Sequence, residues 1–393
     1  MFKKKGDKED LGFFGRNKLA MAIATLMGTI IGAGILGIPY VVAKTGFVYG
    51  FIIMVILGSA FLFLNLFMGE VVLRTKKQHQ FPGYAEKYLG KWGKRITTVS
   101  MLIGLYGALI AYLIGEGATL YALFGFGSPL LFTIIFFLIT SSVIYLGMRA
   151  TGKVELILVI LLFLVVSLIG IFSFKNINWS YLAHFNLANI FIPYGVIVFA
   201  YVGLPSIPEL QEVLGKERWK MKKAIIIGST IPIILYVLFT LVIIGLVGLD
   251  NFELLKPNEK IATIALSIYS HQLLGIFANL LAMLSMFTSF LTIGIALKEI
   301  FEYDYGFSKN WSLFFTLSVP LVVALFNFTS FITVLGITGT IAGGLDGILI
   351  ILMYWKAKLL GDRNPEYSMG KHYFLGTLLM IMFGLGMVYY FIF

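Results

Sequence analysis

The chain has 393 residues, of which 59% are hydrophobic and 12% are charged, and its 30 lysines and arginines against 19 acidic residues give a formal net charge of +11. Apolar runs fill nearly the whole length, which is typical of an all-α polytopic membrane protein and leaves no room for a separate soluble domain. The absence of cysteine excludes disulfides and thiolate metal sites, and the four histidines are too scattered to predict an imidazole metal centre.

Eleven apolar stretches are predicted to cross the bilayer as helices. They are residues 19–43, 46–73, 96–123, 129–148, 154–174, 190–213, 224–248, 262–300, 311–327, 331–355 and 373–392. Because eleven is odd, the two termini are expected on opposite sides of the membrane.

Basic residues gather in alternate loops. Of the 30, 26 lie in residues 1–18, 74–95, 149–153, 216–223, 298–309 and 356–371, whereas the intervening loops hold only Lys44, Lys175, Lys256 and Lys260. The positive-inside rule therefore predicts a cell-membrane protein with a cytoplasmic N-terminus and an extracellular C-terminus. Residues 1–18 are expected to be a cytoplasmic tail and not a cleaved signal peptide. The basic charge predicts contact with anionic lipid and not with nucleic acid.

The first span carries an unusual run, Gly28-Thr29-Ile30-Ile31-Gly32-Ala33-Gly34-Ile35-Leu36-Gly37-Ile38-Pro39. Glycine weakens helix continuity and proline removes a backbone donor. Because an unsatisfied peptide group is costly in hydrocarbon, a broken helix survives only where protein covers it or water reaches it, which predicts a binding site at mid-membrane depth. The alternative is that Gly28 and Gly32, four residues apart, allow close helix packing.

The sixth span contains a second break, because Pro205 and Pro208 follow Gly203 and cannot sit in an undisturbed helix. Matched breaks in spans one and six favour an inverted-repeat transporter. The predicted organisation is a first five-helix repeat at 19–174, an inverted second repeat at 175–355, and a cytoplasmic loop with an eleventh helix at 356–393. The alternative is that both spans are merely kinked packing helices.

The eighth span carries Ser285, Thr288, Ser289 and Thr292 on one helical face. Hydroxyl and carbonyl oxygens suit a hard cation such as sodium. Alternatively, these hydroxyls bond their own helix or a neighbouring one.

Several carboxylates lie within or near apolar spans, where an ionisable group is a functional hypothesis by default. Glu116 and Asp346 are the two candidates, and for Glu116 the alternative is a structural hydrogen bond. Glu209 follows the break in span six. The remaining three are expected to reach water or to pair with basic loops: Glu70, Glu155 and Glu299.

At the two breaks the sequence resembles the amino acid–polyamine–cation (APC) superfamily, which has the LeuT-type fold, and within it the amino acid/auxin and aromatic amino acid permease branch. The resemblance covers nearly the whole chain. The residues that carry it are Gly28 to Leu36 with Pro39, Ser206-Ile207-Pro208-Glu209-Leu210, and Thr288-Ser289-Phe290-Leu291. It implies a substrate site between spans one, three, six and eight.

The resemblance also implies roles for individual residues. The α-carboxylate of a substrate would meet the N–H groups of Gly32, Ala33 and Gly34, and its ammonium would meet carbonyls near Gly28 and Thr29 and those of Phe199, Ala200, Tyr201 and Val202. Phe199 or Tyr201 would form an aromatic lid. A coupling sodium ion would lie among Gly28, Ile31, Ser285, Thr288 and Ser289. Some proton-coupled relatives use a lysine of span five, which residues 156–174 lack, so the first candidate for proton coupling here is Glu116.

We therefore expect a secondary active importer of amino acids, driven by a sodium or proton gradient through alternating access. Neutral or aromatic substrates are favoured, because only Glu116 or Glu209 could pair with a charged side chain. The rival hypothesis is a membrane amino acid sensor of the same fold with little turnover. An enzyme is not expected, because no nucleophile–base or metal-ligand constellation is evident, and a channel would need a continuous polar pore. The expected partners are the amino acid, the bilayer and the coupling cation, without nucleic acid, an obligate protein partner or a cofactor besides sodium.

Overall fold

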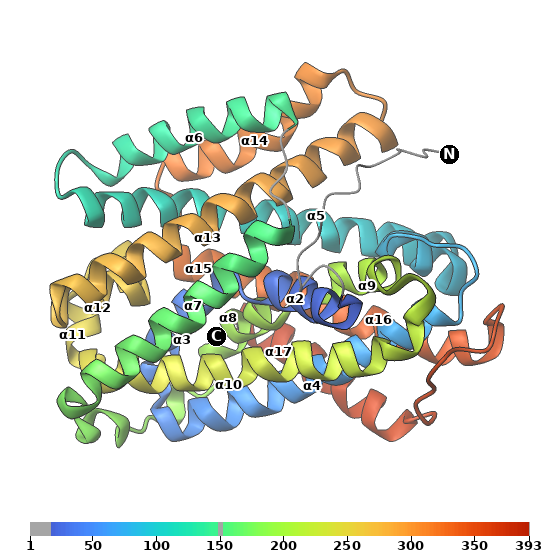
Figure 1. Ribbon diagram of the computed structural model, residues 1–393, viewed down its shortest axis with the longest axis horizontal. Helices are drawn as coiled ribbons and strands as arrows, with labels where there is room; N and C mark the ends of the chain where they lie inside the picture. The colour runs from blue at the N-terminus through green and yellow to red at the C-terminus, as the bar shows by residue number, and fades with distance from the viewer. Residues whose placement is uncertain (1–16, 148–151, 393) are drawn as a thin grey trace.

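The structure is a computed structural model that describes residues 17–147 and 152–392, and the regular elements in these ranges are all helical. Most of the tail predicted at 1–18, and residues 149–151 of the predicted loop 149–153, lie outside the described residues. Figure 1 shows most helices running along the long axis of the molecule, with α11 and α12 gathered at one end.

The longer helices are α2 (Lys18–Ile30), α3 (Gly34–Thr45), α4 (Phe47–Leu73), α5 (Phe81–Phe124), α6 (Pro129–Leu146), α7 (Gly152–Ser173), α8 (Pro193–Tyr201), α9 (Ile207–Leu214), α10 (Met221–Val247), α11 (Leu249–Leu254), α12 (Ala262–Tyr269), α13 (Gln272–Glu299), α14 (Lys309–Leu325), α15 (Phe331–Thr338), α16 (Gly344–Leu360) and α17 (Tyr373–Ile392). The short 3₁₀ and π segments are η1 (Phe174–Asn176), η2 (Trp179–Leu182), η3 (Leu187–Asn189), η4 (Leu204–Ser206), η5 (Gly215–Lys220), η6 (Pro257–Lys260), η7 (Ile300–Asp304) and η8 (Gly339–Gly343).

The described helices are sufficient for a multi-pass membrane protein. Eight of them are long and apolar enough to cross a bilayer, and the bent pair α2 and α3 forms a ninth span. One of the eight is a 55-residue stretch, Pro193–Val247, which contains both α8–α9 and α10, and α14 is a shorter apolar helix. The eleven predicted spans are therefore each represented.

One predicted span is wrong. The stretch 262–300 is not one span, because α12 ends at Tyr269 and α13 begins at Gln272 after a sharp turn. The sequence does not reveal this turn, because α12 is itself rich in apolar residues such as Ile264, Ala265 and Leu266, which are buried. α5 (Phe81–Phe124) is interrupted at Gly90, whose φ of 77° and ψ of −168° lie outside helical geometry, so a kink separates the helical stretch that begins at Phe81 from the helix that contains the predicted third span.

Both predicted breaks are present. α2 and α3 meet at an angle of 54° across Ile31, Gly32 and Ala33. α8 ends at Tyr201 and the chain leaves helical geometry at Val202 and Gly203 before η4 and α9. Proline is the second residue of both η4 and α9, in the first turn, where its missing N–H is not needed.

The two broken helices are in backbone contact. A Cβ atom built on Gly34 would lie 2.6 Å from the Cα of Ala200, so α3 and α8 approach more closely than any side chain permits. On its other side α8 packs at Gly195 against the backbone of α15 and η8, at Gly336 and Gly339. α8 is thereby held between spans one and ten.

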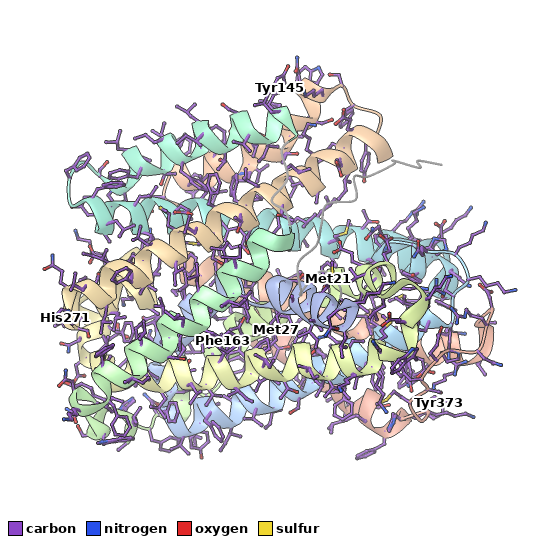
Figure 2. All side chains as sticks on the ribbon, in the orientation of Figure 1. Met21, Met27, Tyr145, Phe163, His271 and Tyr373 are labelled. Atoms are coloured by element: carbon purple, nitrogen blue, oxygen red, sulfur yellow. The ribbon has the colours of Figure 1, made fainter. Side chains whose placement is uncertain are left out.

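Large apolar side chains cover the outer faces of the bundle, as a lipid environment requires. Examples that are more than half exposed are Ile56, Leu146, Phe172 and Leu385, and Figure 2 shows side chains projecting from the outer helices α6, α7 and α14. Two of the basic loops meet at one end of the bundle, where Lys87 pairs with Asp362 and where Arg74 and Lys358 both pair with Glu70.

Candidate functional site

The first break frees backbone groups in the interior of the bundle. Ile31 has φ −83° and ψ 80°, outside helical geometry, and the N–H of Gly32 reaches back only to the carbonyl of Ile30, at 3.0 Å. The first N–H groups of α3 have no acceptor within their own helix. Their partial positive charge favours an anion such as a carboxylate. Ala33 and Gly34 are buried, whereas Thr29 is exposed and its hydroxyl donates to the carbonyl of Thr25.

The second break frees carbonyl groups beside the first. α8 ends one residue after Ala200, which lies against Gly34. The hydroxyl of Tyr236, on α10, is 2.7 Å from the Ile30 carbonyl oxygen and 3.2 Å from that of Ala200. Tyr236 was not identified from the sequence. The only local signal was a tyrosine on the same face as Ser229 in an otherwise apolar span.

The aromatic residues of α8 point in different directions. Tyr201 is buried and stacks on Tyr236, with ring centroids 5.3 Å apart, and its ring lies next to Gly58 of α4. Phe199 is half-buried and packs beside Gly339 of η8. Tyr201 is thus engaged with α4 and α10, which leaves Phe199 as the candidate lid.

The five residues expected around a cation lie together. Gly28, Ile31, Ser285, Thr288 and Ser289 line one small cavity of about 20 Å³, closed on the third side by Leu158, Val159 and Leu162 of α7. A space of this size holds about one water molecule or one small ion.

The hydrogen bonds within α13 leave the hydroxyl oxygen of Thr288 able to accept a hydrogen bond or to coordinate a cation. Its hydroxyl donates to the carbonyls of Leu284 and Ser285, both at 3.1 Å. Thr292 donates to the Thr288 carbonyl at 3.0 Å and does not line the cavity. The helix-internal bonds considered as an alternative are therefore present. They do not use the oxygen lone pairs that a cation needs.

Glu116 lies on the same face of α5 as Tyr112, four residues away. The Tyr112 hydroxyl lies near Ser289 and would lie 3.2 Å from a Cβ atom built on Gly32. Glu116 is fully buried, faces the backbone of Phe287, and has no hydrogen-bond partner for either carboxyl oxygen among the described residues. An unpaired charge is costly to bury, so this carboxyl is suited to carry a proton.

The other carboxylates are placed elsewhere. Asp346 accepts a 2.7 Å hydrogen bond from Ser100 between α16 and α5. Glu70 is buried against Arg74 and Lys358, which confirms the predicted pairing with basic groups. Glu209 is exposed, and the side chain of Glu155 lies outside the described residues.

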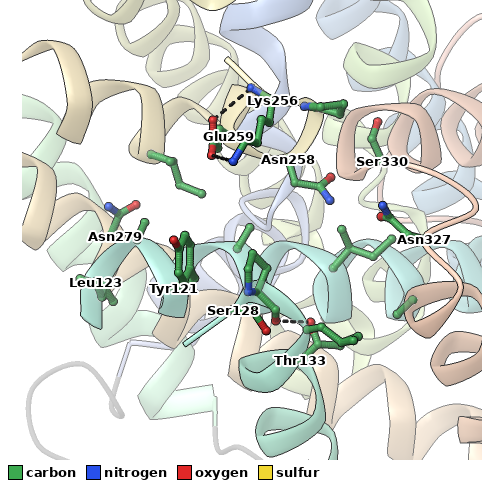
Figure 3. A pocket seen from close by; sticks show the side chains of 18 of the residues that line it. Tyr121, Leu123, Ser128, Thr133, Lys256, Asn258, Glu259, Asn279, Asn327 and Ser330 are labelled. Atoms are coloured by element: carbon green, nitrogen blue, oxygen red, sulfur yellow. Dashed lines mark hydrogen bonds and ion pairs between the residues drawn. The ribbon is translucent and has the colours of Figure 1, made fainter. Parts of the chain in front are cut away.

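A second, much larger cavity lies away from the breaks. It measures about 1110 Å³ and lies at the ends of α5, α6 and α13–α15 near α12. Figure 3 shows its polar wall, including Lys256, Asn258, Glu259 and Asn279. Because its lining includes no residue of α2, α3 or α8, we assign the candidate site to the two breaks and the small cavity beside them.

The chain is similar in sequence to known amino acid transporters. The chain resembles Tyrosine-specific transport system 1 of Haemophilus influenzae, with 28% identity over 363 residues that cover 87% of this chain and 89% of the relative. It is 26% identical to Glutamine transporter 2 of Aliivibrio fischeri, over 82% of this chain and 85% of that protein. These relatives are transporters and not enzymes.

The crystal structure of MhsT in complex with L-phenylalanine superposes with a TM-score of 0.68 at 15% sequence identity, covering 97% of this chain and all of MhsT. This likeness shows that the fold is the LeuT type, as the family resemblance implied. A family model described as the tryptophan/tyrosine permease family matches residues 15–390. With nearly the whole chain matched, this protein belongs to the tryptophan/tyrosine permease family.

Proposed function

We propose that this protein is a secondary active importer of neutral amino acids, with aromatic ones as the first candidates, in the cell membrane. The observation that carries the proposal is the meeting of the two broken helices at Gly34 and Ala200. There the N–H end of α3 offers partial positive charge, and the carbonyl ends of α2 and α8 offer partial negative charge, which together suit a zwitterion.

The substrate class is supported by the relatives. Those named above transport tyrosine and glutamine, and a further relative, in Shigella flexneri, is a tryptophan-specific transport protein, 24% identical. All three side chains are uncharged. Among the described residues that the resemblance places in the site, Glu116 is the one with a charged side chain, and it is fully buried.

The proposed orientation places the N-terminus in the cytoplasm. The basic end of the bundle holds Arg74, Lys358 and Lys87, and the opposite end holds Lys44 and Lys260, which both contact Glu253. By the positive-inside rule the first of these ends is cytoplasmic. At this opposite end, Lys260 Nζ also donates a hydrogen bond to the hydroxyl of Tyr40 of α3, at 3.1 Å.

We propose sodium as the driving ion, held in the small cavity. Its potential ligands are the hydroxyls of Thr288 and Ser289 and the carbonyls of Gly28, Ile31 and Ser285. Oxygen ligands in this number suit a hard cation. Proton coupling through Glu116 is the second candidate, because this carboxyl is buried without a partner among the described residues.

The test is uptake of labelled tyrosine, tryptophan, phenylalanine and glutamine into proteoliposomes under imposed sodium and pH gradients. Sodium coupling predicts uptake that needs sodium and that Thr288→Ala loses, whereas Thr292→Ala, which removes a hydroxyl from the same face but outside the cavity, retains it. Uptake that ignores sodium, follows an inward proton gradient and disappears in Glu116→Gln would instead establish the proton mechanism. If none of these amino acids is accumulated, the transport proposal is wrong, and tight binding without flux would identify a sensor.

A further inference from the structure

Tyr236 connects the two broken helices. It is fully buried in α10, and its hydroxyl lies between the Ile30 carbonyl, at 2.7 Å, and the Ala200 carbonyl, at 3.2 Å. Ile30 is the last residue of α2 and Ala200 is the last but one of α8. One side chain therefore reaches the carbonyl end of both half-helices.

These carbonyls need a donor from outside their helices. In an unbroken helix the Ile30 carbonyl would accept from the N–H of Gly34, and the Ala200 carbonyl from the N–H of Leu204. At each break the backbone leaves helical geometry before it reaches that N–H. The Ile30 oxygen receives the N–H of Gly32 at 3.0 Å. A buried carbonyl without a donor is costly, and because Ile30 already has the N–H of Gly32, the Tyr236 hydroxyl stabilises the broken geometry mainly through the Ala200 carbonyl.

The hydroxyl cannot serve both carbonyls fully. A tyrosine has one O–H proton, and two acceptors compete for it, with the shorter distance at Ile30. The Ala200 carbonyl therefore keeps an acceptor site that is incompletely used. An α-ammonium group carries three N–H donors and complements this deficit.

We propose that Tyr236 is a positioning residue for the ammonium of the substrate: it fixes the spacing of the Ile30 and Ala200 carbonyls, and the substrate supplies the donor that the bridge lacks. The inference rests on the proposed function, since it assumes an amino acid between the breaks. Tyr236 acts through the two carbonyls and through the α2–α8 geometry, and its aromatic ring contributes separately by stacking on Tyr201.

Tyr201 provides a matched control. It is as buried as Tyr236 and shares the same stacked pair, but its hydroxyl has no hydrogen-bond partner among the described residues. Tyr201→Phe and Tyr236→Phe therefore remove the same atom from adjacent rings, and only the second removes the bridge.

The experiment measures binding of the best transported amino acid and of its analogue in which hydrogen replaces the α-ammonium, for wild type and both variants in detergent. We expect Tyr236→Phe to weaken binding of the amino acid about 5- to 10-fold, the effect of losing one well-used hydrogen bond, and to change binding of the analogue less than about 2-fold. The ratio of the affinity for the amino acid to the affinity for the analogue therefore falls. A general structural role would weaken both ligands together.

The outcomes separate the two proposals. If wild type binds no amino acid, the proposed function fails. If wild type binds and transports but Tyr236→Phe retains the ammonium preference of Tyr201→Phe, the positioning role is wrong.

Should Tyr236→Phe not fold, 3,5-difluorotyrosine at position 236 keeps the bridge and changes the acidity of the hydroxyl. If the bridge organises the ammonium site, the ratio of the affinity for the amino acid to the affinity for the analogue without the ammonium changes. An unchanged ratio overturns the inference.

Discussion

Replacing Glu70 with glutamine should destabilise the protein far more than its position at a helix end suggests. Glu70 lies near the end of α4 with no exposed surface. Its carboxylate accepts hydrogen bonds from Arg74 Nε at 2.7 Å, Lys358 Nζ at 2.5 Å, Ser368 Oγ at 3.1 Å and the Met369 N–H at 2.6 Å. These contacts tie the loop after α16 to α4.

The magnitude follows from burial. The side chains of Arg74 and Lys358 are only 16% and 9% exposed, so both cations depend on this carboxylate. Removing one partner of a buried ion pair costs about 3–5 kcal/mol, because the remaining charge is left uncompensated. Glutamine retains one acceptor oxygen, so we expect a loss at the lower end, about 3 kcal/mol of unfolding free energy.

The assay is unfolding of the purified protein in detergent, followed by tryptophan fluorescence. Glu86→Gln is the control, since its pair with Lys94 joins two side chains that are 45% and 51% exposed, and exposed pairs contribute about 0–1 kcal/mol. Adding Lys358→Met to Glu70→Gln should recover part of the loss by removing one stranded cation. Equal shifts for Glu70→Gln and Glu86→Gln would refute the reasoning.

Two further predictions concern the helix breaks and the outer end. Gly34→Ala should lower the melting temperature and abolish uptake, because the new Cβ would lie 2.6 Å from the Ala200 backbone, whereas Gly384→Ala, with no atom within 4 Å, should change neither. Glu253 is partly buried, which alone raises its pKa, but Lys260 and Lys44 outweigh this and lower the pKa overall. A lowered pKa means that the ion pair stabilises the folded protein above the ordinary pKa of 4.5 and loses this effect as the pH falls through the lowered value. The difference in melting temperature between wild type and Glu253→Gln should therefore stay constant from neutral pH to about pH 5 and shrink below it, and a difference that grows on acidification would contradict this.

Much of the fold is decided locally. A span must satisfy its own backbone in lipid, so hydropathy identifies the helices, and glycine and proline mark where a helix cannot continue. For this reason Gly28 to Pro39 and Gly203 to Pro208 indicated both breaks, and the alternating basic loops predicted an orientation. The grouping of Gly28 and Ile31 with Thr288 came from the family resemblance, and the small cavity brings these residues together.

Contacts between distant segments decided the rest. The sequence marks Tyr236 as one tyrosine in an apolar span, because nothing local shows that carbonyls from two other helices converge on it. Glu70 reads as a residue near water until the loop after α16 folds over it. The division of 262–300 was hidden because α12 is mostly apolar, so its side chains resemble those of a membrane span. Local composition determines where the chain must be helical or broken, and only packing determines which freed polar groups meet.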